Sequence, residues 1–491
     1  MEKITESRQY ETIKIIFLKS MSELFPNYDV ELQNSLNNGS YGEVFDKNEI
    51  VELSNEDYEK VKEQMRKTIA ENLPITLATD DIELMKENWR KIERDDIREL
   101  LKNCGWAKIK AFQVGGYTDY FYLEPEKLTG LVKDFDLYKY DRGFILKTPM
   151  EVFDWNVAPM KDTPKIAQAF QEGNDWERIM GINFAGSLNK KVFKREIAEL
   201  IMLNETLHTK KINKFANEII RNNKIKIVTI AGPSSSGKTT LSKKLRLHLQ
   251  TSGIKTLAIS LDDYYVGRAN VPLDENGNKD FETIHALDTK LLNENLRDLI
   301  AGKEVELPLY DFFTGERKSV GHIEKLEENG IIILEGIHGL NDELTKYIPR
   351  ENKYKIYISC LTQTNMDRHN RVHTTDVRKI RRIVRDSLSR ATTGEETLEM
   401  WNSVRKGEEK WIFPFQEEAD AIFNSSLCYE LGVLKPYAIR ELIKIDIESP
   451  QYEEAKKLVE LLSCFVDIET ELVPSDSLLK EFIGGSVFYN Y

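Results

Sequence analysis

Residues 223–446 alternate strand patterns with helix patterns, which predicts an α/β fold: a parallel sheet with helices on both faces. A glycine-rich loop between the first strand and the first helix of this region supports the same fold class. Before it, residues 1–150 mix amphipathic helices with short strands and predict an α+β domain. Residues 151–222 are mainly helical and predict a connector, and residues 447–491 predict a C-terminal helix and tail.

The N-terminal elements follow from the spacing of apolar residues. Residues 11–25 carry apolar side chains at helical spacing, and residues 55–71 predict a charged helix that begins after a serine cap. Aromatic-rich stretches at 117–123 and 143–147 predict strands. A long helical pattern over 194–220 leads into the α/β region.

In the α/β region each predicted strand is a short apolar run that ends at a turn or at a polar residue. The helix over 240–250 follows the glycine-rich loop, and the helix over 451–465 lies in the tail. The predicted strands are 225–231, 256–261, 330–334, 354–359 and 419–423.

The glycine-rich loop has the pattern of a Walker A phosphate loop between a strand and a helix. Its glycines allow backbone N–H groups to turn toward phosphate oxygens, and the helix N-terminus adds a positive dipole end. Lys238 would reach the β- and γ-phosphates, and the Thr239 hydroxyl would bind Mg²⁺. The alternative is a glycine turn without a ligand. The residues predicted to bind the nucleotide are Gly232, Pro233, Ser234, Ser235, Ser236, Gly237, Lys238, Thr239 and Thr240.

Two further strands end in carboxylates, where parallel strands line a ligand site. Asp262 and Asp263 follow the second strand, and one of them can accept the proton of an attacking hydroxyl; the alternative is an Asp pair that caps a turn. Glu335 closes an apolar strand, as a Walker B acid does, and can help to hold Mg²⁺; the alternative is a helix cap. His338 is assigned a structural role.

A group of arginines follows in a chain that is otherwise acidic. Three of them, Arg378, Arg382 and Arg385, share one helical face and can neutralise a triphosphate. A solvated surface helix is the alternative. The full group is Arg368, Arg371, Arg378, Arg381, Arg382, Arg385 and Arg390.

The composition limits the location and the partners. The formal net charge of −13 argues against broad nucleic-acid binding, although it leaves a local basic groove in the N-terminal domain open. The four cysteines form no close pair, and no stretch has the length and hydropathy of a signal peptide or a membrane span. A cytoplasmic location with reduced thiols and no membrane partner is expected.

The motifs between residues 223 and 446 resemble those of the uridine kinase/phosphoribulokinase family. They are the phosphate loop, Asp262 with the residues after it, residues 308–312, Glu335 with its neighbours, and residues 381–386. The resemblance implies an ATP- and Mg²⁺-dependent P-loop kinase, with Asp262 as general base. Its catalytic residues would be Lys238, Asp262, Arg385 and Arg390, its metal residues Thr239 and Glu335, and its substrate-binding residues Tyr265, Phe281, Glu282, Tyr310, Phe312 and Arg382.

Two positions depart from the family pattern. Gly315 stands where uridine-cytidine kinases carry a base-contacting histidine, and Thr392 stands where they carry a further arginine. The resemblance therefore implies the phosphoryl-transfer core rather than a particular base.

Residues 1–150 resemble the second additional, editing-type domain of threonyl- and alanyl-tRNA synthetases. The similar features are residues 16–26, the charged helix after Leu53, and Gly115 to Tyr117. Editing sites use histidine pairs, and this chain has no histidine before His208, so neither a zinc centre nor an editing centre is expected there. The whole layout is similar to a bacterial subgroup usually labelled uridine kinase-like.

These features predict an ATP-dependent phosphotransferase that acts on a hydroxyl of a nucleoside, such as uridine or cytidine, or of a related sugar-bearing metabolite. The alternative is a nucleotide-gated regulator that binds RNA or protein and has no small-molecule acceptor. A carboxylate at Asp262 favours the kinase, because a switch needs no base next to an acceptor hydroxyl. The sequence leaves open the acceptor, the oligomeric state (a homo-oligomer included), and the roles of residues 1–150 and of the C-terminal tail.

Overall fold

The structure is a computed structural model that describes residues 5–91, 94–102, 104, 109–274, 277–311 and 314–489. The chain divides into two compact units. Unit 1 consists of Met1–Glu196, Thr362–Thr374 and Glu460–Val466. Unit 2 consists of Ile197–Leu361, Thr375–Val459 and Asp467–Tyr491. Each unit is therefore built from segments that are far apart in the sequence.

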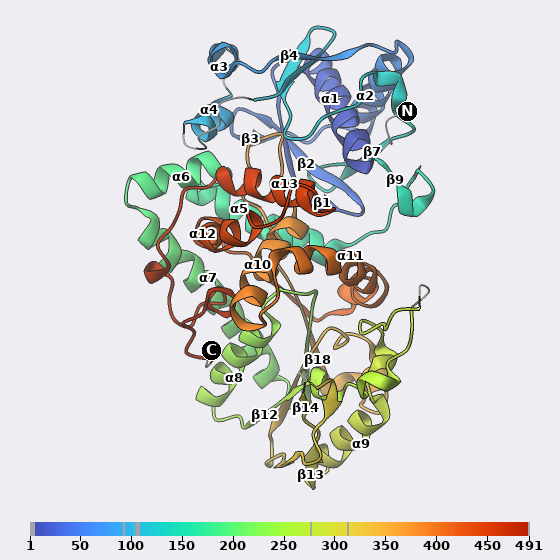
Figure 1. Cartoon of the computed structure of the whole chain (residues 1–491), viewed down its shortest axis with the longest axis vertical. Helices are drawn as coiled ribbons and strands as arrows, with labels where there is room; N and C mark the ends of the chain where they lie inside the picture. The colour runs from blue at the N-terminus through green and yellow to red at the C-terminus, as the bar shows by residue number, and fades with distance from the viewer. Residues whose placement is uncertain are drawn as a thin grey trace. The chain divides into compact units, whose positions relative to one another are not determined.

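Unit 1 contains two larger antiparallel sheets with helices packed against them, and a two-stranded antiparallel pair of β9 and β10 (Figure 1). One sheet has the order β1-β2-β8-β7, with β3 paired to β2, and the other has the order β4-β5-β6. Its strands are β1 (Asp29–Leu36), β2 (Gly39–Asp46), β3 (Glu49–Ile50), β4 (Ile75–Thr79), β5 (Ala111–Val114), β6 (Tyr117–Tyr120), β7 (Asp136–Tyr140), β8 (Gly143–Lys147), β9 (Pro149–Met150) and β10 (Asn156–Val157). Its helices are α1 (Glu6–Leu24), α2 (Asn55–Ala70), α3 (Ile82–Lys91), α4 (Asp95–Leu101), α5 (Pro164–Met180) and α6 (Ala185–Phe193).

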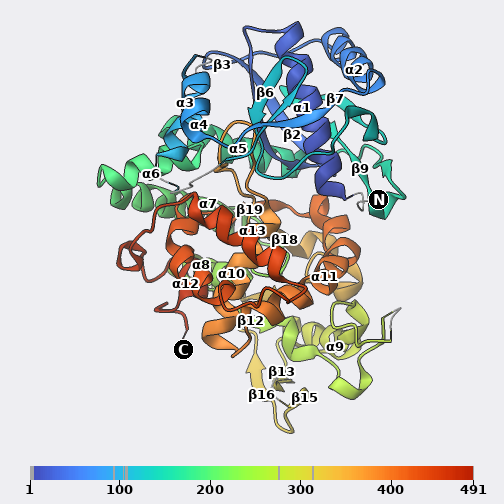
Figure 2. The ribbon, with the colours of Figure 1, turned by 45° about the horizontal axis from the view of Figure 1, so that its top comes forward.

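Side-chain caps determine where the first two helices begin. The Thr5 side chain accepts a hydrogen bond from the Arg8 N–H, so α1 begins at Glu6, five residues before the predicted start at 11. Ser54 and Asp57 form a capping box at the start of α2. The apolar face of α1 is buried in a core with both sheets, and α1 and α2 lie side by side (Figures 1 and 2).

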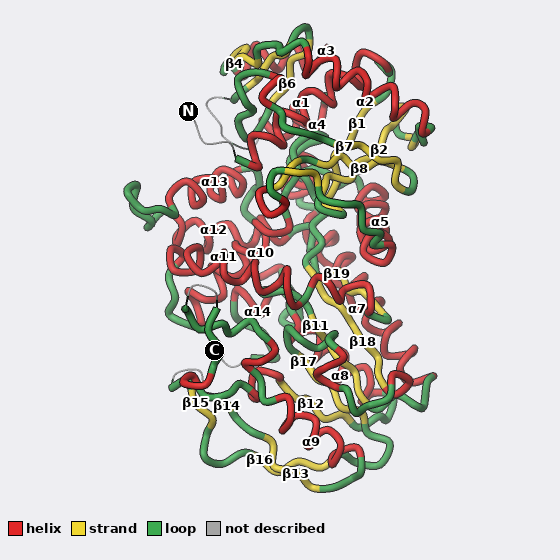
Figure 3. Tube along the Cα trace, turned by 90° about the vertical axis from the view of Figure 1, so that its right-hand side faces the viewer, coloured by secondary structure: helices red, strands yellow, loops and turns green. Residues whose placement is uncertain are grey.

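Unit 2 has the predicted parallel sheet, in the order β12-β17-β11-β18-β19 (Figure 3). The order places β11 at the centre, and β11 pairs in parallel with β17 and β18. The α/β prediction for this region is confirmed. The strands of this sheet are β11 (Ile227–Ala231), β12 (Thr256–Ser260), β17 (Ile331–Glu335), β18 (Lys353–Ser359) and β19 (Ala421–Asn424).

The rest of unit 2 is mainly helical. Two short antiparallel ladders, β13 (Glu304–Leu307) with β16 (His322–Lys325) and β14 (Tyr310–Asp311) with β15 (Glu316–Arg317), extend from the sheet layer; β13 and β16 are visible in Figure 2. The helices are α7 (Ile197–Arg221), α8 (Lys238–Thr251), α9 (Thr289–Ile300), α10 (Thr374–Ser389), α11 (Gly394–Trp411), α12 (Glu430–Leu442), α13 (Tyr452–Ser463) and α14 (Lys480–Ile483). Helices α10 and α13 each have one end in unit 1.

Two predictions from composition can be compared with the structure. All four cysteines, Cys104, Cys360, Cys428 and Cys464, are buried, and among the described residues they form no disulfide bond. Among the residues that the structure describes, no helix combines the length and the apolar character needed to cross a membrane.

Candidate active site

Three neighbouring parallel strands bring the predicted chemical groups to one edge of the sheet. In the register of these strands, Glu335 at the end of β17 lies beside Ile230 of β11 on one side and beside Ser260 of β12 on the other. The phosphate loop leaves β11 at Gly232, and Asp262 follows β12 after two residues. The carboxyl ends of parallel strands form the usual ligand edge of such a sheet.

The phosphate loop has the backbone conformation that its glycines allow. Gly237 has a φ of +89° and precedes the first residue of α8, Lys238. A Cβ on Gly232 would lie 1.9 Å from the carbonyl oxygen of Ile358, so this position requires glycine. The Oγ atoms of Ser235 and Ser236 are buried without a hydrogen-bond partner among the described residues. Unpaired buried donors of this kind fit a phosphate group that accepts hydrogen bonds.

Lys238, Thr239 and Glu335 meet at the start of α8. The Lys238 Nζ donates to the carbonyl oxygens of Gly232 and Pro233, at 3.0 and 3.1 Å. The Thr239 hydroxyl donates to Glu335 Oε1 at 3.2 Å. Burial lowers the pKa of Lys238, whereas burial and the charge of Asp262 raise the pKa of Glu335 to about 7. A hydroxyl oxygen and a carboxylate this close are the hard ligands that suit Mg²⁺.

The two adjacent aspartates have different surroundings. Asp263 Oδ1 accepts a hydrogen bond from the backbone N–H of Tyr310 at 3.1 Å, so Asp263 holds a neighbouring strand. The side chain of Asp262 is exposed to solvent, and no hydrogen bond of its carboxylate is found in the described part of the chain. The protein around it still removes enough water to raise its pKa, against the charges of Lys238 and Arg390. Asp262 is therefore the carboxylate that is available to a ligand.

Three arginines predicted to act in catalysis or substrate binding converge on one carboxylate. The Nε atoms of Arg382, Arg385 and Arg390 lie 3.2, 2.7 and 3.6 Å from oxygens of Asp386. Arg382 also donates to the Ser234 hydroxyl of the phosphate loop, at 3.2 Å. One negative charge faces three positive charges, so this end of α10 retains a positive excess next to the loop.

The other arginines of α10 support the loop from behind. Arg378 donates to the carbonyl oxygen of Ser234 at 2.9 Å and pairs with the buried Glu408 of α11. Glu408 in turn accepts the Ser234 N–H at 3.1 Å. Arg381 is fully buried and pairs with Glu430. Glu408 and Glu430 could not be predicted from the sequence, because they lie in other helices and carry no motif.

The predicted arginine group is divided between the units. Arg368 and Arg371 belong to the segment Thr362–Thr374 of unit 1, where Arg368 pairs with Asp29 at 2.9 Å and Arg371 donates to the Ser35 hydroxyl. The expectation that they share one basic cluster with the arginines of α10 is therefore wrong. The segment that contains them belongs to unit 1, although the segments before and after it belong to unit 2. A charge pattern in the sequence does not reveal this division.

The aromatic residues predicted for the acceptor pocket are in contact. The ring centre of Tyr265 lies 6.2 Å from that of Phe281 and 5.6 Å from that of Tyr310. The Tyr265 hydroxyl donates to the carbonyl oxygen of Phe281 at 3.1 Å, which fixes the orientation of its ring. Phe312 lies outside the described residues.

Glu282 lies beside this aromatic group. Removal from water and the charge of Glu408 raise the pKa of Glu282 to about 7, and Arg382 and Lys238 oppose this rise. A Cβ on Gly407 would lie 2.3 Å from the Glu282 Cβ, so α11 approaches this residue closely. His338 is buried, and its ring lies edge-on to Trp411 at 6.0 Å, which agrees with a structural role.

The two positions that depart from the family pattern have backbone roles. Gly315 has a φ of +72° and its carbonyl oxygen accepts the Arg268 N–H at 2.8 Å. A side chain there would be strained, because φ is positive. The Thr392 N–H donates to the carbonyl oxygen of Asp386 at 3.2 Å and so closes the end of α10.

Unit 1 has a buried cluster of charges that includes a histidine. Arg94 pairs with Asp96, Asp119 and Asp367 at 2.9, 3.1 and 3.2 Å. His369 Nδ1 lies 2.5 Å from Asp119. Burial would raise the pKa of Asp119, but Arg94 and His369 together hold it well below its usual value. The segment Thr362–Thr374 thus brings histidine to this unit, which the count over residues 1–150 missed.

Among the described residues, no group of three or more His, Cys, Asp and Glu side chains is arranged to hold a metal ion. His369 instead belongs to the ion-pair cluster.

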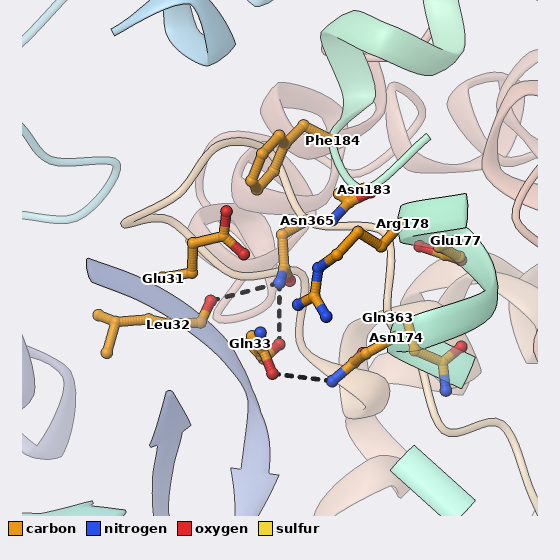
Figure 4. A pocket seen from close by; sticks show the side chains of 10 residues that line it. All are labelled: Glu31, Leu32, Gln33, Asn174, Glu177, Arg178, Asn183, Phe184, Gln363 and Asn365. Atoms are coloured by element: carbon orange, nitrogen blue, oxygen red, sulfur yellow. Dashed lines mark hydrogen bonds between the residues drawn. The ribbon is translucent and has the colours of Figure 1, made fainter. Parts of the chain in front are cut away.

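A small polar cavity lies between β1, α5 and the segment Thr362–Thr374, all within unit 1 (Figure 4). Its volume is about 20 Å³, which suits a water molecule rather than a nucleoside. Burial raises the pKa of Glu177 to about 8, and its Oε1 accepts a hydrogen bond from Thr364. Glu177 Oε2 and Gln363 Nε2 have no partner among the described residues.

Comparison with known proteins assigns the family of the C-terminal part. The model of the Phosphoribulokinase / Uridine kinase family matches residues 227–431. A uridine kinase of Ligilactobacillus salivarius is 32% identical over 203 residues, which cover 41% of this chain and 86% of that protein. A uridine kinase of Anoxybacillus flavithermus is 30% identical over 220 residues, which cover 44% of this chain and 95% of that protein.

Two solved structures also align with part of this chain. A possible uridine kinase from Bacillus stearothermophilus aligns with a TM-score of 0.30 and 22% identity, over 44% of this chain and 97% of that one. A D-glycerate 3-kinase from Cryptococcus neoformans aligns with a TM-score of 0.29 and 14% identity, over 44% and 87%. Residues 1–196 lie outside the family match, and their resemblance to an editing domain stays a prediction. On the sequence relatives, and with its phosphate loop, strand-end acids and arginine helix, the chain belongs to the phosphoribulokinase/uridine kinase family.

Proposed function

We propose that the protein is an ATP-dependent kinase that transfers the γ-phosphoryl group to a hydroxyl of a nucleoside or of a closely related sugar-bearing metabolite. Its family indicates an ATP-dependent kinase that acts on a sugar-bearing substrate. The observation that supports the proposal is the register of three parallel strands, in which Glu335 ends β17 between β11 and β12, the two strands that lead to Lys238 and Asp262. These are a cation, a free carboxylate and a metal-binding acid, the parts that phosphoryl transfer needs.

In the proposed reaction the acceptor hydroxyl attacks the γ-phosphorus of ATP. Asp262 takes the hydroxyl proton, the new O–P bond forms, and the bond from the γ-phosphorus to the bridging oxygen breaks to leave ADP. Lys238 and the arginines near Asp386 neutralise the charge of the phosphates. Thr239 and Glu335 would hold Mg²⁺, which supplies further positive charge to the phosphate oxygens when bound.

The acceptor class follows from Glu282 and the aromatic group. Ring faces of Tyr265, Phe281 and Tyr310 suit a flat base, and a carboxylate suits the two hydroxyls of a ribose. The support is stronger for a ribose than for a particular base, since the glycine at position 315 offers no side chain to read one.

The test is phosphorylation of a panel of ribonucleosides, deoxyribonucleosides and simple sugars by the full chain with Mg²⁺ and ATP. We expect transfer to at least one ribonucleoside, and loss of detectable transfer in Lys238→Ala, since the phosphates lose their fixed counter-charge. Near wild-type turnover in Lys238→Ala would contradict the phosphate-loop assignment. ATP binding without transfer to any acceptor of the panel would favour the regulator instead.

Glu282→Ala tests the sugar preference. The wild type should prefer ribonucleosides, because a missing hydroxyl leaves the carboxylate without its partner and costs about 1–3 kcal/mol. The variant should lose this preference while its ATP Kd changes little. Equal rates on ribonucleosides and deoxyribonucleosides in the wild type would reject the role of Glu282.

A further inference from the structure

The C-terminal segment of unit 2 lies against the phosphate loop, although it is outside the family match, which ends at residue 431. Lys244 of α8 pairs with Asp476 at 2.9 Å. A Cβ on Gly237 would lie 2.6 Å from the Leu478 side chain, so Leu478 packs directly on the loop glycine. The short helix α14 (Lys480–Ile483) follows. This segment is therefore fixed beside the first turns of α8.

A carboxylate of α14 occupies donors at the start of α8. Glu481 Oε2 accepts the backbone N–H of Thr240 at 3.3 Å and the Thr240 hydroxyl at 2.5 Å. The Tyr489 hydroxyl donates to the same carboxylate oxygen at 3.2 Å and lies 2.9 Å from the Thr240 hydroxyl. Glu481 is only 9% exposed, so this is a buried contact and not a surface pair.

These donors have the properties of a phosphate site. The Thr240 N–H lies in the first turn of α8, where the helix dipole favours an anion, directly after the lysine and threonine of a Walker A loop. In such loops the backbone N–H groups hold the α- and β-phosphates. One N–H and one hydroxyl cannot serve a carboxylate and a phosphate oxygen together, and the two anions repel each other.

We infer that Glu481 is a further residue of the nucleotide site, where it acts as an internal anion that holds the Thr240 donors until a nucleotide phosphate displaces it. Nucleotide binding and release of the α14 contact are then linked. The inference rests on the proposed function only for the statement that the site binds a nucleotide, and it is independent of the acceptor.

The linkage predicts that the protein binds nucleotide less tightly than its phosphate loop allows. When only a fraction of the molecules is able to bind a ligand, the apparent Kd is the intrinsic Kd divided by that fraction. Glu481→Gln keeps the shape but removes the charge, and Glu481→Ala removes both the charge and the acceptor. We expect ATP to bind about 3- to 10-fold more tightly to both variants, the range that the net free energy of one ordinary hydrogen bond implies.

The experiment is calorimetric titration of the full chain with ATP in the absence of any acceptor. Asp476→Asn is the matched control: Asp476 joins the same segment to the same helix through Lys244, away from Thr240. Its ATP Kd should stay within about twofold of wild type, a change too small to resolve from the wild-type value. Unchanged or weaker ATP binding in both Glu481 variants overturns the inference, as does equal tightening in Asp476→Asn.

Hydrogen exchange of the 478–489 segment gives a second readout that does not depend on a variant. ATP should increase amide exchange in this segment, whereas adenosine, which has no phosphate, should leave it unchanged. Unchanged or slower exchange with saturating ATP overturns the inference. A failure of the proposed function has a different signature, since loss of acceptor phosphorylation alters neither the titration nor the exchange.

Discussion

Asp262 and Asp263 are neighbours in sequence, and their hydrogen bonds separate them. Asp263 holds the Tyr310 N–H, whereas Asp262 has an exposed carboxylate near Lys238 and Arg390. Asp262→Asn should lower kcat by about 10²-fold or more with little change in the ATP Kd, because general-base help contributes 10²–10⁴-fold. Steady-state kinetics with the best acceptor of the panel measures this.

Asp263→Asn serves as the control for Asp262→Asn. It weakens a hydrogen bond to the backbone, so its main effect should be a lower unfolding midpoint. Its kcat should fall much less than that of Asp262→Asn. A larger loss of kcat in Asp263→Asn than in Asp262→Asn would assign the base to Asp263.

Residues of the site could be predicted where they belong to strand ends. The phosphate loop, Asp262 and Glu335 each follow an apolar run directly, so a local pattern locates them. Glu408 accepts an N–H of the phosphate loop and Glu481 an N–H in the first turn of α8, both from helices far along the chain, and no local pattern marks them. The spacing of apolar residues predicts which residues follow the end of a strand. Tertiary packing determines which carboxylates from distant segments contact those residues.

At the scale of elements, helix α5 carries a buried acid that makes stability depend on pH. Glu177 has its pKa raised to about 8, so the folded chain keeps this proton while the unfolded chain loses it at lower pH. Stability should therefore fall as pH rises from about 5 to about 8. Glu177→Gln should weaken this dependence and be more stable than wild type at pH 8, since Gln can still accept from Thr364. Urea unfolding of the full chain at pH 5.5 and 8 measures it.

Glu172→Gln provides the comparison on the same helix. Glu172 is exposed, and its replacement should leave the pH dependence as it is in wild type. Parallel curves for Glu177→Gln and wild type across this pH range would contradict the burial argument.

The five strands of the parallel sheet could be predicted within about two residues, whereas the short ladders β13–β16 and the helices α9, α11 and α12 were not predicted. β12, for example, is Thr256–Ser260 against a predicted 256–261, and β17 extends one residue beyond the prediction to Glu335. Apolar runs and periodicity are local, so they carry over to the structure. The start of α1 at Glu6 was not predicted. Its first turn consists of polar residues, so no apolar spacing marks the helix after the Thr5 cap.

At the scale of the whole molecule, the segment Thr362–Thr374 is held in unit 1 by the charge cluster around Arg94. Arg94→Ala would leave Asp96, Asp119 and Asp367 buried without their common cation. Such a loss costs about 3–5 kcal/mol, so we expect a marked fall in the unfolding midpoint and faster proteolysis within 362–374.

Arg90→Ala is the matched control for Arg94→Ala. Arg90 pairs with Glu87 at 3.0 Å and its side chain is 65% exposed, so its loss should cost less than about 1 kcal/mol. Equal effects of the two substitutions would show that the cluster does not hold the segment.

The interleaving of the two units was beyond prediction from the sequence. Nothing in residues 362–374 differs in composition from a loop of an α/β domain, and only partners such as Arg94, hundreds of positions earlier, define its place. Charge patterns and periodicity describe residues that are neighbours along the chain, whereas the Arg94–Asp367 ion pair joins residues from its two halves.

This interleaving sets the order of events during synthesis. Residues up to Glu196 leave the ribosome first, yet the unit they form lacks the segment Thr362–Thr374, which carries Asp367 and His369. At about 5–20 residues per second, that segment follows on the order of 10–30 s later. During that interval Arg94, which is buried in the complete unit 1, lacks Asp367, one of the three acids that pair with it. The first unit to be made is therefore completed only after most of the second has been translated.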